Sequence, residues 1–418
     1  GRPLKRAPCY DRMKALGAVF GSVYGWERPN WFAPEGFGID ESALDKPDVL
    51  LNHNHPPVGP DGKVKELWSF RRSNYFDQVG REARHVHEQA GLLDMSAFSK
   101  FEVWGPGAEA WLDSLVANRI PKKIGRIGLA HLLTKSGGVR SEFTIYREGP
   151  QRFYLVSAGA FERHDFDTLQ KLLPTDGTVM LQKVTTQYGV LVLAGPQSRA
   201  ILEQLTDADL STAAFPWLTG KTINVGHATA KALRVNFVGE LGWELHHPIE
   251  MQTTIFDLLM EAGAPHGLKP FGIRAMDALR IEKSYRLIPR ELSIEYAALE
   301  SGLDRFVHLN KAGFIGREAL VEKQQAGFDW AFATLNVHDV SEADARGNEP
   351  LYAGGKLVGR ATSGGFGWRT DQSLALGMVR PELAEIGTEL EISILGKRHM
   401  ATVVPESPFD PDNRRLRA

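Results

Sequence analysis

The hydrophobic pattern divides the chain into a non-periodic start and a regular remainder. Residues 1–68 interleave Gly and Pro with aromatic residues, which is typical of compact irregular structure and not of a long helix. We expect this arm to pack Trp26, Trp31 and Phe32 on the main body or on a partner, because so much aromatic surface is rarely left in water. His53 and His55 lie close together with no third ligand at metal spacing, so we expect a polar loop without a metal.

From residue 69 to about residue 325, helical and strand periods interleave. A helix is expected from about Gln78 to Gln89, where apolar residues recur at helical spacing before a glycine. Further strands are predicted near residues 96–105, 126–159, 184–194 and 222–248, and further helices near residues 105–120, 161–173, 195–205, 251–263 and 271–286. The strand–strand–helix units recur, which indicates an α+β domain with internal pseudo-repeats.

The pattern changes again near residue 326. Short strands separated by Gly and other turn residues follow one another to the end of the chain, which is typical of a small β-barrel. A helix with a polar end over residues 313–327 is the expected junction. We therefore predict three parts: an N-terminal arm over residues 1–68, an α+β domain over residues 69–325 and a barrel over residues 326–418.

Composition narrows the class of protein. The chain has 418 residues, of which 43% are hydrophobic and 24% charged, so it is expected to fold into more than one globular domain. Its formal net charge of -2 offers no basic surface for nucleic acid or for an anionic membrane. The single cysteine, Cys9, excludes an internal disulfide. With no apolar run of membrane-spanning length and no signal peptide, we expect a soluble protein of a reducing compartment, cytoplasmic or, in a eukaryote, in the mitochondrial matrix.

A glycine pair and a nearby carboxylate are the first candidates for chemistry. Gly137 and Gly138 separate an apolar run from an alternating one, so a turn is expected in which both residues adopt angles that other residues resist. Glu142 follows four residues after Gly138, in a short segment that also contains the apolar residues Phe143 and Ile145. A carboxylate at the end of a buried strand is costly unless it is paired, solvated or used. From this segment alone, a solvated strand-edge glutamate and a functional acid are both open.

Eight motifs occur in one order along the chain and carry a family resemblance. They are GLLDMSAFSKFEVWGPGA, SGGVRSEFT, YLVSAG, LVLAGPQSR, FVGELGWELHHP, RAMDALRIEKSYR, ALESGLDRFVHLNKAGFIGREAL and SGGFGWRTDQSLALGMV. In this order they resemble the folate-dependent aminomethyltransferase family, the T-protein of glycine cleavage. They resemble still more closely the folate half of dimethylglycine and sarcosine dehydrogenases, and the opening segment is similar to the joint that follows the flavin domain in those fused enzymes. Since the chain also begins without Met, we expect a processed subunit or a piece of a larger polypeptide.

The resemblance implies a fold and an activity. The fold would be three subdomains in a cloverleaf-like ring around a channel for tetrahydrofolate, the third being the barrel. The substrate would be a small methylated amine or sulfonium compound. In the fused enzymes a flavoprotein domain oxidises an N-methyl amine, and the folate half receives the one-carbon unit as 5,10-methylenetetrahydrofolate. No GxGxxG fingerprint between a strand and a helix occurs here, so we do not expect this chain to oxidise the amine itself.

The resemblance also implies site residues. Glu142 takes the place of the family's acid near folate N10, where T-proteins usually carry Asp, and Glu240 matches a glutamate that resembles an acceptor for the pterin edge. Phe237 stands where the family has Tyr. The other expected contacts with the cofactor are Tyr188 as a pocket wall, Arg274 or Arg280 as a folate contact with the other arginine on a surface acid, and Trp368 as a channel residue. For Glu240 a hairpin-turn role, for Tyr188 and Tyr285 core packing, and for Trp368 an exposed turn position are the competing interpretations.

Three further functions stay open at this stage. One is a free-standing folate-dependent demethylase that takes a methyl group from a quaternary ammonium, sulfonium or methoxy donor and yields 5-methyltetrahydrofolate. Another is a glycine-cleavage T-protein, which would have to dock a lipoyl carrier protein. The last is a folate-binding protein without catalysis, similar to iron–sulfur assembly factors, whose reactive cysteine motif Cys9 does not match.

Overall fold

The computed structural model describes residues 2–37, 49–50 and 68–418. His53 and His55 lie outside the described residues. The N-terminal arm is more regular than expected, because it forms helix α1 (Tyr10–Ala15) and a hairpin of β1 (Ala18–Val23) and β2 (Trp26–Phe32). Short strands β3 (Val49–Leu50) and β4 (Trp68–Ser69) pair with each other. Trp26, Trp31 and Phe32 are all buried. Trp31 and Phe32 belong to hydrophobic clusters of the main body, so the arm packs on the main body, which was one of the two expected placements.

The first large sheet has five strands in the order β10-β6-β9-β8-β7. Its strands are β6 (Ser99–Trp104), β7 (Ile127–Leu133), β8 (Val139–Gly149), β9 (Arg152–Ser157) and β10 (Met180–Lys183). Helices α3 (Ala108–Leu115) and α4 (Glu162–Lys171) cover one face of this sheet, where Phe101, Phe143 and Phe153 form the centre of a hydrophobic core. Among the described residues, no helix of this lobe packs on the opposite face of the sheet. The side chains on that face therefore contact other parts of the molecule.

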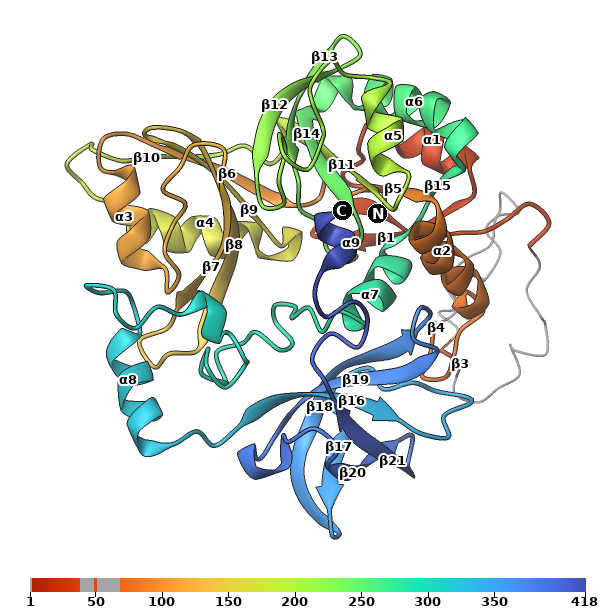
Figure 1. Cartoon of the computed structure of the whole chain (residues 1–418), viewed down its shortest axis with the longest axis vertical. Helices are drawn as coiled ribbons and strands as arrows, with labels where there is room; N and C mark the ends of the chain where they lie inside the picture. Colours follow the sequence, from red (N-terminus) through yellow and green to blue (C-terminus); the bar gives the residue numbers. More distant parts are fainter. Residues whose placement is uncertain (1, 38–48, 51–67) are drawn as a thin grey trace.

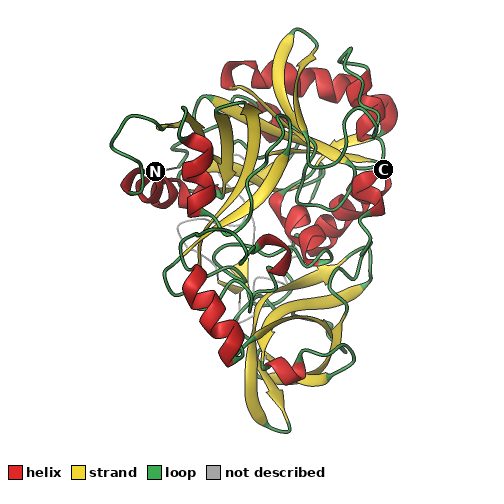
Figure 2. Ribbon diagram, turned by 60° about the vertical axis from the view of Figure 1, so that its left-hand side comes forward, coloured by secondary structure: helices red, strands yellow, loops and turns green. Residues whose placement is uncertain are grey.

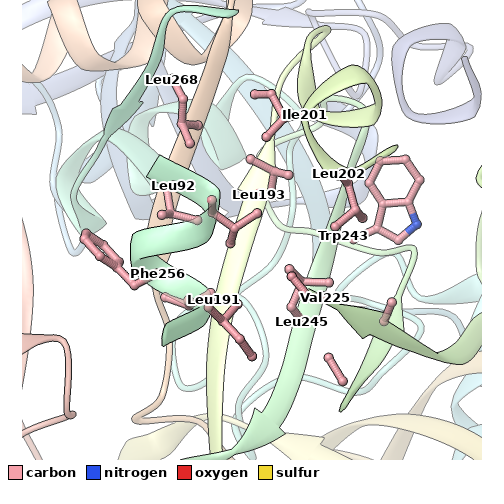
Figure 3. Close-up of a cluster of buried hydrophobic side chains, with 14 of the residues drawn as sticks. Leu92, Leu191, Leu193, Ile201, Leu202, Val225, Trp243, Leu245, Phe256 and Leu268 are labelled. Carbon is pink, nitrogen blue, oxygen red and sulfur yellow. The ribbon is translucent and has the colours of Figure 1, made fainter. Parts of the chain in front are cut away.

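The second sheet has six strands in the order β12-β13-β14-β11-β5-β15. Its strands are β5 (Ala90–Asp94), β11 (Tyr188–Ala194), β12 (Gly220–Val225), β13 (Ala228–Leu233), β14 (Gly242–Pro248) and β15 (Leu268–Pro270). Helices α5 (Ser198–Glu203) and α6 (Gln252–Gly263) cover one face, with Ile201, Phe256 and Trp243 in the core between them and the sheet (Figure 3). Helices α2 (Phe76–Glu88) and α7 (Ile273–Ile281) pack over part of the other face through Val192 and Ala194.

The two sheets repeat one topology, as the recurring sequence units predicted. The spatial order β6-β9-β8-β7 of the first sheet corresponds to β11-β14-β13-β12 of the second. In both, the leading strand ends in a Gly-Pro step that turns the chain into a helix. Gly105 and Gly195 have φ of 119° and 121°, a region that favours glycine, and in each case a Cβ would meet a backbone carbonyl within 2.5 Å.

The third part is a closed barrel of six strands in the order β16-β19-β18-β17-β20-β21. The strands are β16 (Ala331–Val337), β17 (Pro350–Ala353), β18 (Lys356–Gly367), β19 (Gln372–Val379), β20 (Glu389–Ile394) and β21 (Lys397–Val404). Helix α8 (Arg317–Ala326) precedes the barrel and forms the expected junction. The predicted small barrel is therefore confirmed.

The two sheets and the barrel form three lobes, with α7 and the C-terminal helix α9 (Arg414–Arg417) between the second lobe and the barrel (Figure 1). Figure 2 shows the strands of the lobes and the helices that pack against them and between them. The predicted α+β, cloverleaf-like architecture is confirmed. One predicted helix is too long: residues 271–286 were expected to be helical, but α7 ends at Ile281, and Ser284 has φ of 53°.

Candidate functional site

The helix-free face of the first sheet meets the inner face of the second. Tyr146 and Tyr154 of the first sheet share a buried cluster with Leu233 of β13, so the two faces are in contact. Because side chains alternate along a strand, Glu142 lies on the same face of β8 as Tyr146, and Glu244 lies on the same face of the second sheet as its cross-strand partner Leu233. Two acidic side chains therefore stand on the surfaces by which the lobes face each other.

Glu142 pairs with a histidine across the sheet. His131 of β7 is directly opposite Glu142 of β8, and its Nε2 lies 3.1 Å from Glu142 Oε1. His131 is fully buried, whereas the Glu142 side chain keeps 22% of its exposure. A carboxylate that is hydrogen-bonded through one oxygen and partly exposed to solvent can still contact a ligand.

The glycine turn before Glu142 is fixed by a neighbouring segment. Gly137 has φ of 87°, as expected, but Gly138 does not have a positive φ. Gly138 is required for space instead, because a Cβ there would lie 2.6 Å from the backbone oxygen of Ile294. The amide of Val139 donates to Ser293 O at 2.8 Å, and the amide of Ala298 donates to Gly137 O at 2.9 Å. These contacts hold the start of β8, and with it the position of Glu142.

Glu244 is the most perturbed acid on the facing surfaces. Burial raises the pKa of Glu244 to about 8. Its Oε2 lies 3.1 Å from His246 Nε2, and His246 Nδ1 lies 3.1 Å from the Tyr154 hydroxyl of the first sheet. Burial also lowers the pKa of His246 well below its usual range, so this histidine is neutral. The Glu244 side chain keeps only 10% of its exposure.

Tyr188 lies in the contact between the two sheets. Lys231 Nζ stands 4.7 Å from the centre of the Tyr188 ring and 4.5 Å from that of Tyr154. The same ammonium group pairs with Glu102 at 3.3 Å and Glu148 at 2.9 Å, both from the first lobe. These contacts indicate that Tyr188 helps to join the lobes, and its role as a pocket wall stays a prediction.

Glu240 forms the centre of an ion-pair network. Its Oε1 accepts from Arg369 at 2.9 Å and lies 2.9 Å from His87 Nδ1, and its Oε2 accepts from Arg415. The Glu240 and Arg369 side chains are both at least 99% buried, so the pair is shielded from water. Both carboxylate oxygens are thus already used between the second lobe, the barrel and the C-terminal segment. Binding of the pterin edge by Glu240 stays a prediction, and these contacts favour a structural role.

The remaining residues that were predicted to contact the cofactor pack against other side chains of the protein. Phe237 stacks on Tyr285 with ring centres 5.5 Å apart, and both rings are half-buried. Arg274 stands over the Tyr75 ring at 5.4 Å. Trp368 contacts Phe76 of α2 with ring centres 4.8 Å apart, and its ring fills the space next to Gly80, so the barrel loop packs on α2. Their roles as cofactor contacts stay predictions.

Arg280 is fully buried and pairs with a partly exposed acid. Its Nε donates to Asp277 at 2.6 Å, and its other nitrogens donate to Tyr285 O and to Ser363 Oγ of the barrel. The guanidinium group therefore connects α7, the segment after it and β18. Of the two arginines, Arg280 has a structural position.

Two residues of the facing surfaces were missed from sequence. His131 was missed because a cross-strand pair depends on register, which alternation alone does not give. Glu244 was missed because its strand is buried on both faces, so the sequence GWELHH shows no clean alternation. A glutamate with a histidine two residues later in an apolar strand was the available sign, because such residues share a face. In the part of the chain that the structure describes, no group of three His, Cys, Asp or Glu side chains is placed to hold a metal, and no helix is long and apolar enough to cross a membrane.

Comparison with known proteins places this arrangement in a family. The GCVT N-terminal domain matches residues 9–311, and the glycine cleavage T-protein C-terminal barrel domain matches residues 332–410. The chain belongs to the glycine cleavage T-protein family. A crystal structure of the glycine cleavage system aminomethyltransferase T from Bartonella henselae superposes with a TM-score of 0.79, covering 98% of this chain and 99% of that chain at 23% identity, which supports the fold alone.

Three curated relatives align with nearly the whole of this chain. Mouse mitochondrial dimethylglycine dehydrogenase is 36% identical over 97% of this chain and 44% of its own length. Human mitochondrial sarcosine dehydrogenase is 30% identical over 100% of this chain and 48% of its own length. An aminomethyltransferase of Desulfitobacterium hafniense is 29% identical over 96% of this chain and 97% of its own. The chain thus spans about half the length of the dehydrogenases that it matches.

Proposed function

We propose that this chain is a tetrahydrofolate-dependent one-carbon transferase. It accepts a carbon unit at the oxidation level of formaldehyde from an N-methyl amine, which a flavoprotein domain or subunit oxidises, and gives 5,10-methylenetetrahydrofolate. The similarity to dimethylglycine and sarcosine dehydrogenases over about half of their length supports the flavoprotein partner. Dimethylglycine- or sarcosine-like amines are the proposed donors.

The observation that carries the proposal is the pair of partly open acids on the facing sheets. Tyr146 lies four residues beyond Glu142, about 13 Å along the strand, and it is paired with Tyr154, whose hydroxyl contacts the histidine next to Glu244. Both acids thus stand on the two facing sheets, and we propose that the pterin and its methylene bridge bind between them. A pterin edge rich in N–H donors matches a carboxylate with one oxygen uncommitted, so the side chains fit the cofactor.

Each acid has a proposed task. Glu244 would accept hydrogen bonds from the pterin edge, and its burial makes those bonds strong. Glu142 would hold or move a proton beside the reacting nitrogens, and its negative charge would stabilise the passing iminium cation. Tetrahydrofolate, when bound, supplies the two nitrogens that accept the carbon unit.

The test combines ligand binding with product analysis. The purified chain should bind tetrahydrofolate in calorimetry and should accelerate its condensation with formaldehyde over the spontaneous rate, with 5,10-methylenetetrahydrofolate as the product in mass spectrometry. Incubation with glycine betaine or dimethylsulfoniopropionate should yield no product. Formation of 5-methyltetrahydrofolate from either donor would instead establish the free-standing demethylase.

Glu142→Gln tests the catalytic assignment. We expect it to lower the enzyme-catalysed rate constant about 100-fold or more, because a neutral amide neither takes a proton nor stabilises a cation. Its affinity for tetrahydrofolate should stay within about threefold, because only the acid–base function is removed. The matched control is Glu109→Gln, the same chemical change on α3, where the side chain pairs with Lys122 and Arg147 at the surface. An unchanged rate in Glu142→Gln contradicts the assignment.

A further inference from the structure

We propose that His131 is a positioning residue for Glu142: it donates its Nε2–H to one carboxylate oxygen and so leaves the other oxygen aimed at the ligand. This inference rests on the proposed function, because it concerns the same site. It assigns a role to a residue that neither the sequence motif nor the family description includes.

The fold itself creates the pair. His131 and Glu142 are direct cross-strand partners in the β7–β8 ladder, and the bulge in this ladder lies beyond them, between Leu132 and Leu133. The backbone of His131 is fixed in turn, because its carbonyl accepts from the amide of Ala117 at 2.9 Å. The side chains of directly opposite residues must meet. The 3.1 Å contact is therefore imposed by register and does not depend on a flexible loop.

The hydrogen-bond pattern of the ring selects one tautomer. Nδ1 of His131 is buried without a hydrogen-bond partner among the described residues, and the edge of Phe306 packs nearby with ring centres 5.8 Å apart. A buried N–H without a partner is costlier than a bare lone pair, so the proton belongs on Nε2. In this tautomer the N–H of His131 points at Glu142 Oε1.

The two side chains of the pair differ in burial. His131 is fully buried and Glu142 is 22% exposed, so the histidine holds the carboxylate from inside. Glutamate has one more rotatable bond than the aspartate usual at this place in T-proteins, and fixing that bond costs free energy. The bond from His131 restrains this extra freedom before a ligand arrives, which is how preorganisation raises a rate.

Two replacements of His131 separate a positioning role from a packing role. His131→Phe keeps an aromatic ring and removes the donor, whereas His131→Gln keeps an N–H donor of similar reach. We expect His131→Phe to lower kcat about 10- to 100-fold, because a misplaced catalytic group costs this much. KM for tetrahydrofolate should change by less than about threefold, and His131→Gln should restore kcat to within about threefold of the wild-type value.

A double-mutant cycle shows whether His131 acts through Glu142. In a Glu142→Gln background, His131→Phe should lower the rate by less than about twofold further, because the group that it positions is already absent. Independent, multiplying effects would overturn the proposal. So would a His131→Phe variant that has a lower melting temperature but an unchanged kcat.

One measurement needs no variant. Long-range ¹H–¹⁵N NMR of histidine side chains in the full chain should show His131 with its proton on Nε2, and a proton on Nδ1 would overturn the proposal even where His131→Phe does not fold. Failure of the proposed function looks different. In that case the wild-type chain neither binds tetrahydrofolate nor forms the product, whatever the state of His131.

Discussion

Glu240 and Glu244 lie four residues apart and have opposite electrostatic environments. Glu240 is surrounded by Arg369, Arg415 and His87, so its negative charge is compensated within the protein. Glu244 is hydrogen-bonded to the neutral His246, and burial alone raises the pKa of Glu244 to about 8. The compensated acid is suited to holding lobes together, and the uncompensated acid is suited to receiving a donor-rich ligand.

The raised pKa of Glu244, about 8, predicts that binding of tetrahydrofolate releases a proton at pH 7. The free chain holds the proton at this pH, and a ligand edge that donates hydrogen bonds favours the ionised carboxylate. Binding should therefore release about one proton at pH 6–7 and fewer as the pH rises past 8. Calorimetry in buffers of different ionisation enthalpy measures this number.

Glu244→Gln is the control for the proton count, because an amide has no proton to release. The variant should bind tetrahydrofolate at least tenfold more weakly at pH 8, since an amide oxygen is a weaker acceptor than a carboxylate. Proton release that persists in Glu244→Gln would assign the proton to another group.

At this scale the sequence named Glu142 and Glu240 as candidate acids and missed the surroundings of Glu142. Glu142 was singled out by the glycine pair before it and by the family resemblance, and its catalytic role stays a prediction. His131 and Glu244 were not found, because their importance comes from a cross-strand register and from burial on a two-sided strand. Neither the register nor the burial can be inferred from the neighbouring residues in the sequence.

The element that places Glu142 is the turn before β8. Gly137 needs a left-handed backbone, and Gly138 needs the absence of a Cβ, because the 293–298 segment crosses directly over it. The sequence predicted the turn but could not distinguish these two reasons. The prediction of a helix over residues 271–286 failed for a similar cause, since Arg280 binds the carbonyl of Tyr285 and so stabilises a turn after α7.

Gly138→Ala should destabilise the chain by about 1–3 kcal/mol, because the new methyl group would force the Ile294 backbone away. It should also lower kcat, because the start of β8 and hence Glu142 would shift. Urea unfolding and the formaldehyde condensation assay measure the two effects.

Gly313→Ala is the matched control for this substitution. A Cβ at Gly313 meets no atom within 4 Å, and its φ is not positive, so the stability should change by less than about 0.5 kcal/mol. An equally stable Gly138→Ala variant would contradict the tight crossing of the 293–298 segment over the turn.

At the scale of the whole molecule, buried charges join the second lobe, the barrel and the C-terminal segment. Arg369 of the barrel pairs with Glu240 of the second lobe and with Glu282 at 2.7 Å, and Lys283 donates to the carbonyls of Phe409 and Asp410 in the C-terminal segment. The sequence predicted the lobes, because each has its own periodicity. It could not predict these contacts, because they join residues 87 to 129 positions apart.

Glu240→Gln should destabilise the chain by about 3–5 kcal/mol, since it leaves two arginines partly uncompensated in a buried network. The lobes should then unfold less cooperatively, so differential scanning calorimetry should show a broadened or divided transition. Glu250→Gln, the same change at an exposed position, should leave the transition unaltered. A sharp, unshifted transition in Glu240→Gln would show that the network does not couple the lobes.

The central claim is that a reduced pterin binds where the two sheets face each other, between Glu244 and Glu142. A crystal structure of the chain with tetrahydrofolate tests it most directly. The account predicts that the donor edge of the pterin lies within hydrogen-bond distance of the Glu244 carboxylate, and that Glu142 lies beside the bridging nitrogens with His131 still bound to its other oxygen. A pterin bound elsewhere, with Glu244 still bonded only to His246 and Glu142 directed into solvent, would contradict it.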